Sequence, residues 1–208
     1  MTGAAVRPLR SDAARNADRI LRAAREVYAL AGPDAAVDAI ARRAGVGERT
    51  LYRRFPSKGE LVRAALDQSI AENLSPAIER ARRRANPLQG LTHLIEAAIS
   101  LGAQEHHLLA AARRAGALAD ISAPLDDALQ TLMSRAQAMG LVRADLVGDD
   151  LPRIIAMLNS VLWTMDPSGG GWRRYVALVL DGMTTTDGRR LRPVPALRYS
   201  SPEADWPL

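Results

Sequence analysis

Hydroxyl and cationic side chains are concentrated in one stretch of the sequence, AGVGERTLYRRFPSKGEL, at residues 44–61. Within it, Thr50, Tyr52 and Lys58 can donate hydrogen bonds to phosphate oxygens. Arginine can also form a two-pronged hydrogen bond with the edge of a guanine base. The same residue types would also suit a helix face that is exposed only to solvent. The secondary structure predicted around the stretch distinguishes these two interpretations.

Two short helices joined by a tight turn are predicted around this stretch. Residues 37–44 place apolar side chains at helical spacing on one face, and the Gly-Val-Gly sequence after them permits a sharp turn because glycine tolerates a positive φ. A second helix is predicted at about residues 48–55, with Leu51 and Phe55 directed inward one turn apart. With a preceding helix as support, this pair makes a helix-turn-helix, whose second helix enters the major groove of DNA.

A longer helix precedes this pair and a capped helix follows it. Ser57 and Glu60 form an S-x-x-E capping box, in which the Ser57 hydroxyl accepts from the Glu60 amide. Lys58 then falls in the first turn of the following helix, where its charge opposes the helix dipole and a bound phosphate would explain its presence. The inward residues predicted for the preceding helix are Ile20, Leu21, Ala24, Val27, Tyr28 and Ala31.

The excess positive charge of the chain is confined to its first third. Residues 1–65 hold 13 Lys and Arg against 7 Asp and Glu, a net charge of +6, whereas the remainder holds 15 against 16, a net charge of −1. This asymmetry predicts a polyanionic partner for the first third, most simply nucleic acid.

The composition excludes several other classes of protein. The 208 residues are 48% hydrophobic and 25% charged, as in ordinary globular proteins, and they include no cysteine, which excludes disulfides and thiolate metal sites. No apolar run reaches the roughly 18 residues of a membrane helix. No apolar segment follows the N-terminal arginines, as one would in a secretory signal. A cytoplasmic protein without a membrane partner is expected.

Residues 18–66 resemble the DNA-binding domain of the TetR family of bacterial transcriptional regulators. The similarity is carried by RILRAAREVYALAG and AVDAIARRAGVGERTLYRRFPSKGEL, of which TLY-x-x-F-x-x-K is the most specific part. It implies a homodimer, most often a repressor, that binds a palindromic double-stranded DNA operator and is released by a small molecule. The DNA contacts that the resemblance assigns by position are Val37, Gly47, Glu48, Arg49, Thr50, Tyr52, Arg54 and Lys58.

These positions divide by the chemistry expected of them. Thr50, Tyr52 and Lys58 correspond to phosphate contacts of the family, whereas Arg49 suits guanine and Glu48 suits the amino group of cytosine. Gly47 and Arg54, like Glu48 and Arg49, lie where family members touch bases or the nearby backbone.

Three positions in this region carry weaker expectations. Val37 stands where the family often has a hydroxyl residue, so a side-chain cap and a possible phosphate contact are lost, although its amide can still donate. Arg7 and Arg10 precede the first predicted helix and suit either an arm in the minor groove or a disordered tail.

The chain after residue 66 is predicted to stay helical, because five further segments have helical length and end at Gly, Pro or Asp. The expected fold is all-α, with an N-terminal three-helix helix-turn-helix domain at residues 1–66. A helical ligand-binding and dimerisation domain follows at 67–183. The proline-rich residues 184–208 are expected to form an extended or disordered tail.

A ligand pocket is predicted in the second domain from what that domain lacks. No Phe, Tyr or Trp occurs from residue 66 to residue 162, so this span cannot supply an aromatic cage for a cationic ligand. We predict a mainly aliphatic pocket for an uncharged or weakly polar effector, although each lining residue would equally suit a plain core. The predicted lining residues are Leu94, Ile95, Leu109, Leu132, Met133, Met157 and Trp163.

Apolar stripes on the last two predicted helices need a surface to bury against. One stripe can face the core of the domain, and the resemblance places the others at a four-helix interface between two subunits. The predicted interface residues are Leu158, Val161, Leu162, Met165, Val176, Val179, Leu180 and Met183.

Motifs for catalysis, cofactors or metals do not stand out. His106 and His107 are adjacent, and neighbouring helical positions diverge by about 100°, so their imidazoles do not suit a single metal ion. We therefore expect no enzymatic activity, cofactor or metal. Two alternatives stay open: a helical enzyme or ligand carrier with a scaffolding basic domain, and a nucleoid-type protein that binds DNA without sequence preference.

Overall fold

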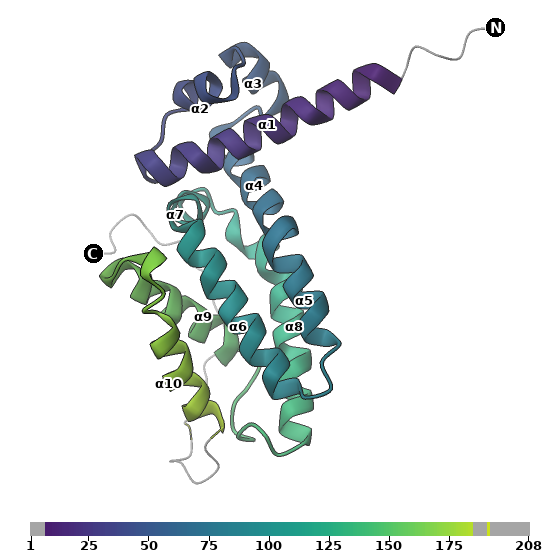
Figure 1. The fold of residues 1–208 in the computed structure, drawn as a ribbon, viewed down its shortest axis with the longest axis vertical. Coiled ribbons are helices and arrows are strands. Elements are labelled where there is room, and N and C mark those ends of the chain that lie inside the picture. The colour runs from purple at the N-terminus through teal and green to yellow at the C-terminus, as the bar shows by residue number, and fades with distance from the viewer. Residues whose placement is uncertain (1–6, 185–190, 192–208) are drawn as a thin grey trace, which may run out of the picture. The chain divides into compact units, whose positions relative to one another are not determined.

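The computed structural model describes residues 7–184 and Leu191, apart from the side chains of residues 7–13 and 118–122. Within that part of the chain every regular element is helical, which confirms the all-α prediction (Figure 1). The predicted tail lies outside the described residues except for Thr184 and Leu191. No described helix combines the length and the apolar character needed to cross a bilayer.

Three of the described helices are not α-helical. The α-helices are α1 (Arg7–Ala31), α2 (Val37–Ala44), α3 (Glu48–Arg54), α4 (Lys58–Ser69), α5 (Ser75–Arg82), α6 (Pro87–Gln104), α7 (His106–Arg114), α8 (Leu118–Ala138), α9 (Asp150–Val161) and α10 (Arg173–Thr184). A π-helical segment, η1 (Ile70–Leu74), and two 3₁₀ segments, η2 (Leu162–Thr164) and η3 (Pro167–Gly169), complete the set. Helix α4, η1 and α5 follow one another without a non-helical residue between them.

The chain divides into two compact units, each of which is built from two separate segments of the sequence. The first unit comprises Met1–Ser69 and Glu105–Leu118, and the second comprises Ile70–Gln104 and Ala119–Leu208. The boundary predicted after residue 66 lies close to Ser69, where the chain first passes from the first unit to the second. The return of residues 105–118 to the first unit was not predicted, and it means that α7 belongs with α1–α4.

Helix α1 supports the first unit because one of its faces is buried. Ile20, Ala24 and Tyr28 are completely buried, as the helical spacing predicted. Helices α2, α4 and α7 all contact α1, and α3 lies beside α2 (Figure 1). The buried residues that α2, α3 and α4 add to this core are Ile40, Ala41, Ala44, Leu51, Leu61, Val62, Ala65 and Leu66.

A buried carboxylate fastens the start of α7 to the rest of the first unit. Glu105 is 6% exposed, and its Oε1 accepts hydrogen bonds from Arg25 Nε at 2.6 Å and from Ser69 Oγ at 2.7 Å. Arg25 belongs to α1 and Ser69 ends α4, so one side chain joins three helices. A carboxylate can be buried here because it is both paired and hydrogen-bonded.

Helix α6 is central to the second unit, since α5, α9 and α10 all contact it. Two glycines allow close approach: a Cβ at Gly90 would lie 2.8 Å from the carbonyl oxygen of Ala81, and one at Gly102 would lie 1.9 Å from Asn159 Oδ1. Any larger residue at either position would force α5 or the Asn159 side chain to move.

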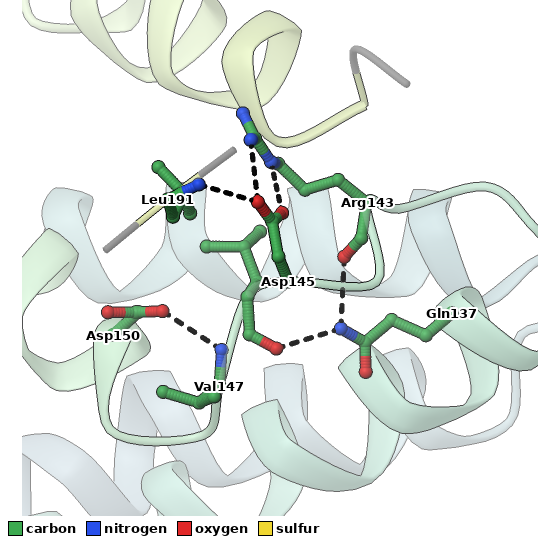
Figure 2. Close-up of polar contacts among 7 residues, drawn as sticks. Gln137, Arg143, Asp145, Val147, Asp150 and Leu191 are labelled. Atoms are coloured by element: carbon green, nitrogen blue, oxygen red, sulfur yellow. Dashed lines mark hydrogen bonds and ion pairs between the residues drawn. The ribbon is translucent and has the colours of Figure 1, made fainter. Parts of the chain in front are cut away.

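Hydrogen bonds fix the loop between α8 and α9 (Figure 2). Arg143 donates to both oxygens of the Asp145 carboxylate, from Nε at 2.6 Å and from Nη2 at 2.9 Å, and the Leu191 amide donates to it at 2.8 Å. The Gln137 side chain donates to the carbonyl oxygens of Arg143 and Leu146 at 3.0 and 2.9 Å. The hydrogen bonds from Arg143, followed by that from Leu191, hold the pKa of Asp145 well below its ordinary value.

Candidate nucleic-acid interface

Helix α3 presents a polar surface and buries the two residues predicted to anchor it. Leu51 is 1% exposed and Phe55 is 7% exposed, so both inward predictions are confirmed. The exposed side chains of α3 are those of Glu48, Arg49, Tyr52, Arg53 and Arg54, and that of Thr50 is half-buried. The sequence-predicted contacts on α3 therefore all reach the surface of the first unit.

The turn before α3 depends on one glycine and not on two. Gly45 caps α2 with φ of +65°, in the left-handed region where glycine carries no steric penalty. Gly47 has φ of −73°, which any residue adopts, and a Cβ built on it would meet no atom within 4 Å. The space above Gly47 is thus open to a partner, and the backbone geometry there does not demand glycine.

Helix α2 begins without a side-chain cap, as predicted. Its N-cap residue, Ala36, has extended backbone angles and makes no side-chain hydrogen bond to the helix. The Val37 side chain is half-buried. Val37 can therefore contribute to an anion contact only through its backbone amide.

Lys58 opens α4 in the predicted setting, with one addition. The Ser57 hydroxyl accepts from the Glu60 amide at 3.1 Å, which confirms that half of the capping box. The exposed Lys58 ammonium also lies 5.9 Å from the centroid of the Tyr28 ring. This cation–π contact offsets part of the unfavourable helix dipole. Burial, with a smaller effect of Asp34, raises the pKa of Tyr28 to about 12.

The arginines of the first unit have two kinds of surroundings. The paired ones, each within an ion-pair distance of an acidic side chain, are Arg25, Arg42, Arg43 and Arg114. Across the described ranges, none of Arg49, Arg53 and Arg54 makes such a pair. Like charges held together without counterions repel each other, and a bound polyanion removes that repulsion.

Three polar residues of α1 line a groove together with α3, a proximity that was not predicted from the sequence. Arg15, Asn16 and Arg19 line a groove of about 760 Å³, and Thr50 and Arg53 of α3 line it as well. Their proximity depends on how α1 passes the helix-turn-helix, which no local pattern encodes. The only available signal was the recurrence of arginine along α1.

The predicted pocket residues are distributed over both units. Those that lie in the core of the second unit are Leu94, Ile95, Leu132 and Met133. Leu109 belongs to α7 in the first unit, and Met157 and Trp163 are 57% and 55% exposed. The lining of a ligand pocket therefore stays a prediction.

The predicted subunit-interface residues are divided between the core and the surface of the second unit. The fully buried ones are Leu158, Leu162, Val176 and Met183, and the half-buried ones are Val161, Met165, Val179 and Leu180. The first four hold α9, η2 and α10 to their own unit, which corrects their assignment to a partner-facing surface. The large apolar side chains that α9 and α10 do expose are Met157, Tyr175 and Leu178.

The adjacent histidines at the start of α7 lie closer together than predicted. The ring centroids of His106 and His107 are 3.7 Å apart with a tilt of 38° between the planes, so their side chains converge despite their divergent helical positions. Within the described residues, no group of three or more His, Asp or Glu side chains is arranged to hold a metal ion.

Arg7 and Arg10, the candidates for a minor-groove arm, fall within the first turns of α1. Their side chains lie outside the described part of the structure, so the arm stays a prediction.

Two protein-family models match the chain. Residues 20–65 match the model of bacterial regulatory proteins of the tetR family, and residues 86–185 match the C-terminal domain of SbtR-like transcriptional regulators. Among curated proteins no match is found.

Solved structures with a similar fold cover most of the chain. The TetR transcriptional regulator SCO0520 from Streptomyces coelicolor is 30% identical with a TM-score of 0.60, over 82% of this chain and 99% of that one. The regulator FadR from Bacillus subtilis, solved in complex with stearoyl-CoA, is 19% identical with a TM-score of 0.65, over 80% and 97%. The TetR-like regulator LfrR from Mycobacterium smegmatis, solved in complex with proflavine, is 23% identical with a TM-score of 0.60, over 84% and 97%. The last two likenesses concern the fold alone.

Proposed function

The chain belongs to the TetR family of bacterial transcriptional regulators, and we propose that it is a repressor that binds a palindromic operator as a homodimer. The observation that carries this proposal is the exposed surface of α3, with three arginines that have no acidic partner among the described residues. A surface of this kind suits the polyanionic backbone and base edges of DNA. Because its target is chromosomal DNA, we place the protein in the cytoplasm.

The side chains on this surface take different tasks. Arg49 is exposed and suits the O6 and N7 acceptors of guanine, and Glu48 suits the amino group of cytosine. Tyr52 and Thr50 donate to phosphates through their hydroxyls, and Lys58 does so through its ammonium.

The backbone-positioning contacts are completed by three further predicted residues. Arg54 contributes a guanidinium, and Val37 and Gly47 contribute backbone amides, with open space above Gly47. These groups recognise no base sequence by themselves, so they set the position of α3 on the duplex.

The partner of the second unit is a second copy of the chain. Met157, Tyr175 and Leu178 are large apolar side chains exposed on α9 and α10, two helices that contact each other. Exposed apolar side chains gathered on neighbouring helices are typical of a protein interface. A two-fold dimer reads two half-sites, so the operator is expected to be an inverted repeat.

The effector is proposed to be a mainly aliphatic molecule. The second unit has a core of Leu, Ile, Met and Ala side chains, with no Phe, Tyr or Trp in the chain from residue 66 to residue 162. FadR from B. subtilis was solved with stearoyl-CoA and LfrR with proflavine, so the two neighbours differ in the kind of ligand present. In an operator gel shift, release by acyl compounds and not by proflavine would support this choice, and the reverse would contradict it.

Selection of bound fragments from the genome tests the proposal directly. Wild-type protein should enrich fragments that contain one inverted repeat, and the complex should survive an excess of random competitor DNA. Lys58→Ala should weaken binding to all enriched sequences by about tenfold and lower the salt dependence, because it removes one phosphate contact. Enrichment without any shared sequence would instead favour a nucleoid-type protein.

A further inference from the structure

A groove between α1 and the helix-turn-helix is lined by four arginines, of which only Arg54 is among the DNA contacts assigned above. Its walls come from the N-terminal half of α1, from the turn at residues 45–47 and from α3. Its volume is about 760 Å³, and both α1 and α3 belong to the first unit. The arginines that line it are Arg15, Arg19, Arg53 and Arg54.

The charge of this groove points to an anionic occupant. Four guanidinium groups line it, and none of the described lining residues is Asp or Glu. Elsewhere in the same unit, arginines such as Arg25 and Arg43 lie against carboxylates. Among the described residues, Arg19, Arg53 and Arg54 of the groove form no such ion pair.

The exposed surface of α3 has two flanks, of which the groove borders one. Thr50, Arg53 and Arg54 share the groove side because they are spaced one helical turn apart. Glu48 and Tyr52, four residues apart, lie on a different side and are not among the described lining residues. Side chains for DNA contact are thus presented to both sides of the helix.

The width of the DNA major groove matches this two-sided arrangement. An α-helix is about 10–12 Å across and the major groove is about 12 Å wide, so a helix seated in it has a phosphate backbone on each side. Lys58 lies over the ring of Tyr28, which is nine residues beyond Arg19 on α1. At about 1.5 Å per residue, this separates the two cationic positions by about 13 Å along the axis of α1.

We infer that this groove is a second phosphate-binding site, which takes the sugar–phosphate backbone of one DNA strand while Tyr52 and Lys58 hold the backbone of the other. The inference rests on the proposed operator binding and adds Arg15, Arg19 and Arg53 to its contacts. Arg53 and Arg19 donate charge-assisted hydrogen bonds to phosphate oxygens from opposite walls of the groove. The α1 helix thereby becomes part of the DNA-binding surface.

Arg53→Gln and Arg19→Gln test the inference against a matched control on the same helix. Arg22 is exposed on α1 but is not among the residues that line the groove, so Arg22→Gln removes the same charge from outside the site. Affinity for the selected operator is measured by gel shift as a function of salt. Each groove variant should lose about tenfold in affinity, and the slope of log K against log salt should fall by about 0.9. Arg22→Gln should change both values much less.

Ethylation of individual operator phosphates then locates the contact. In wild-type protein, interference is expected on both strands that flank α3 in each half-site, and Arg53→Gln should abolish it on one strand only. Groove variants that match Arg22→Gln in affinity and in the interference pattern would overturn the inference, although operator binding itself would stand.

Failure of the proposed operator binding can be distinguished from failure of the phosphate-binding groove. If wild-type protein selects no operator, the same variants are compared on random duplex DNA at low salt. Loss of affinity in Arg53→Gln and Arg19→Gln alone would retain the phosphate-binding groove and reject the sequence-specific function. Equal affinities of all variants would reject the groove.

Discussion

Arg25 and Arg114 each lie against a carboxylate within the first unit, whereas Arg49 and Arg53 have no acidic partner among the described residues. The same side chain therefore meets two different electrostatic conditions within one small fold. Where it is paired, its charge is neutralised within the fold, and removal of the partner from a buried pair lowers stability. Where it is unpaired on the surface, no described acidic side chain neutralises its charge, and neighbouring arginines repel each other.

The largest effect is expected on the paired side of this comparison. Glu105→Ala should lower the free energy of unfolding by about 3 kcal/mol, because it leaves Arg25 without its carboxylate in a largely buried setting. Urea unfolding measures this change. Glu26→Ala, which breaks the exposed pair with Arg43, is the matched control and should cost less than about 1 kcal/mol. Equal losses in the two variants would remove the distinction between buried and exposed pairing.

The unpaired side should respond in binding and not in stability. Arg49→Gln should leave the urea midpoint nearly unchanged but reduce discrimination at one base position by about 1–3 kcal/mol. Competition between the selected operator and single-base variants measures this discrimination. A uniform loss at every position would reassign Arg49 from base reading to phosphate contact.

Local features of the helix-turn-helix were predictable because their causes lie within a few residues. Leu51 and Phe55 are four positions apart, Gly45 caps a helix, and Ser57 accepts from the Glu60 amide, so each is encoded in a short segment. The DNA contacts that the same sequence patterns predict on α3 stay predictions.

Features that depend on distant segments could not be predicted. Arg19 meets α3 only through the packing of α1, and Glu105 meets Arg25 across 80 positions of sequence. On α9, Met157 and Leu158 are both apolar neighbours, yet one is 57% exposed and the other 3%. The amphipathic pattern is too broad there to determine which of them faces the core.

A smaller effect on the free energy of unfolding is expected at Tyr28, whose ring lies next to the Lys58 ammonium. The Tyr28 hydroxyl is buried and has no hydrogen-bond partner among the described residues. Tyr28→Phe removes this unsatisfied group and keeps the ring, so the free energy of unfolding should rise by about 1 kcal/mol. Operator affinity should not change, because a phenyl ring still attracts the ammonium. Thermal unfolding would count against this account if the Phe variant melted below the wild type.

The smallest effect extends the comparison to a paired arginine of the second unit. The pKa of Asp145 is lowered by its hydrogen bonds from Arg143 and Leu191, so its contribution to stability is present above the ordinary Asp pKa of about 4. That contribution is lost as the pH falls below this value toward the lowered pKa. Asp145→Asn should be less stable than wild type at pH 6, and urea midpoints should show the gap narrowing toward pH 3. A gap that stays constant would show that the pairing contributes no pH dependence.

The return of residues 105–118 to the first unit constrains how this regulator can recombine with its relatives. A single crossover near residue 69 would pair residues 1–69 with a foreign α7, and the hydrogen bonds of Glu105 to Arg25 and Ser69 would be lost unless the donor chain supplied an equivalent acid. A chimera that is meant to carry the first unit intact into another member of the family therefore needs α7 as well. Because the first unit is built from two separate segments of the sequence, a single recombination crossover cannot exchange it intact.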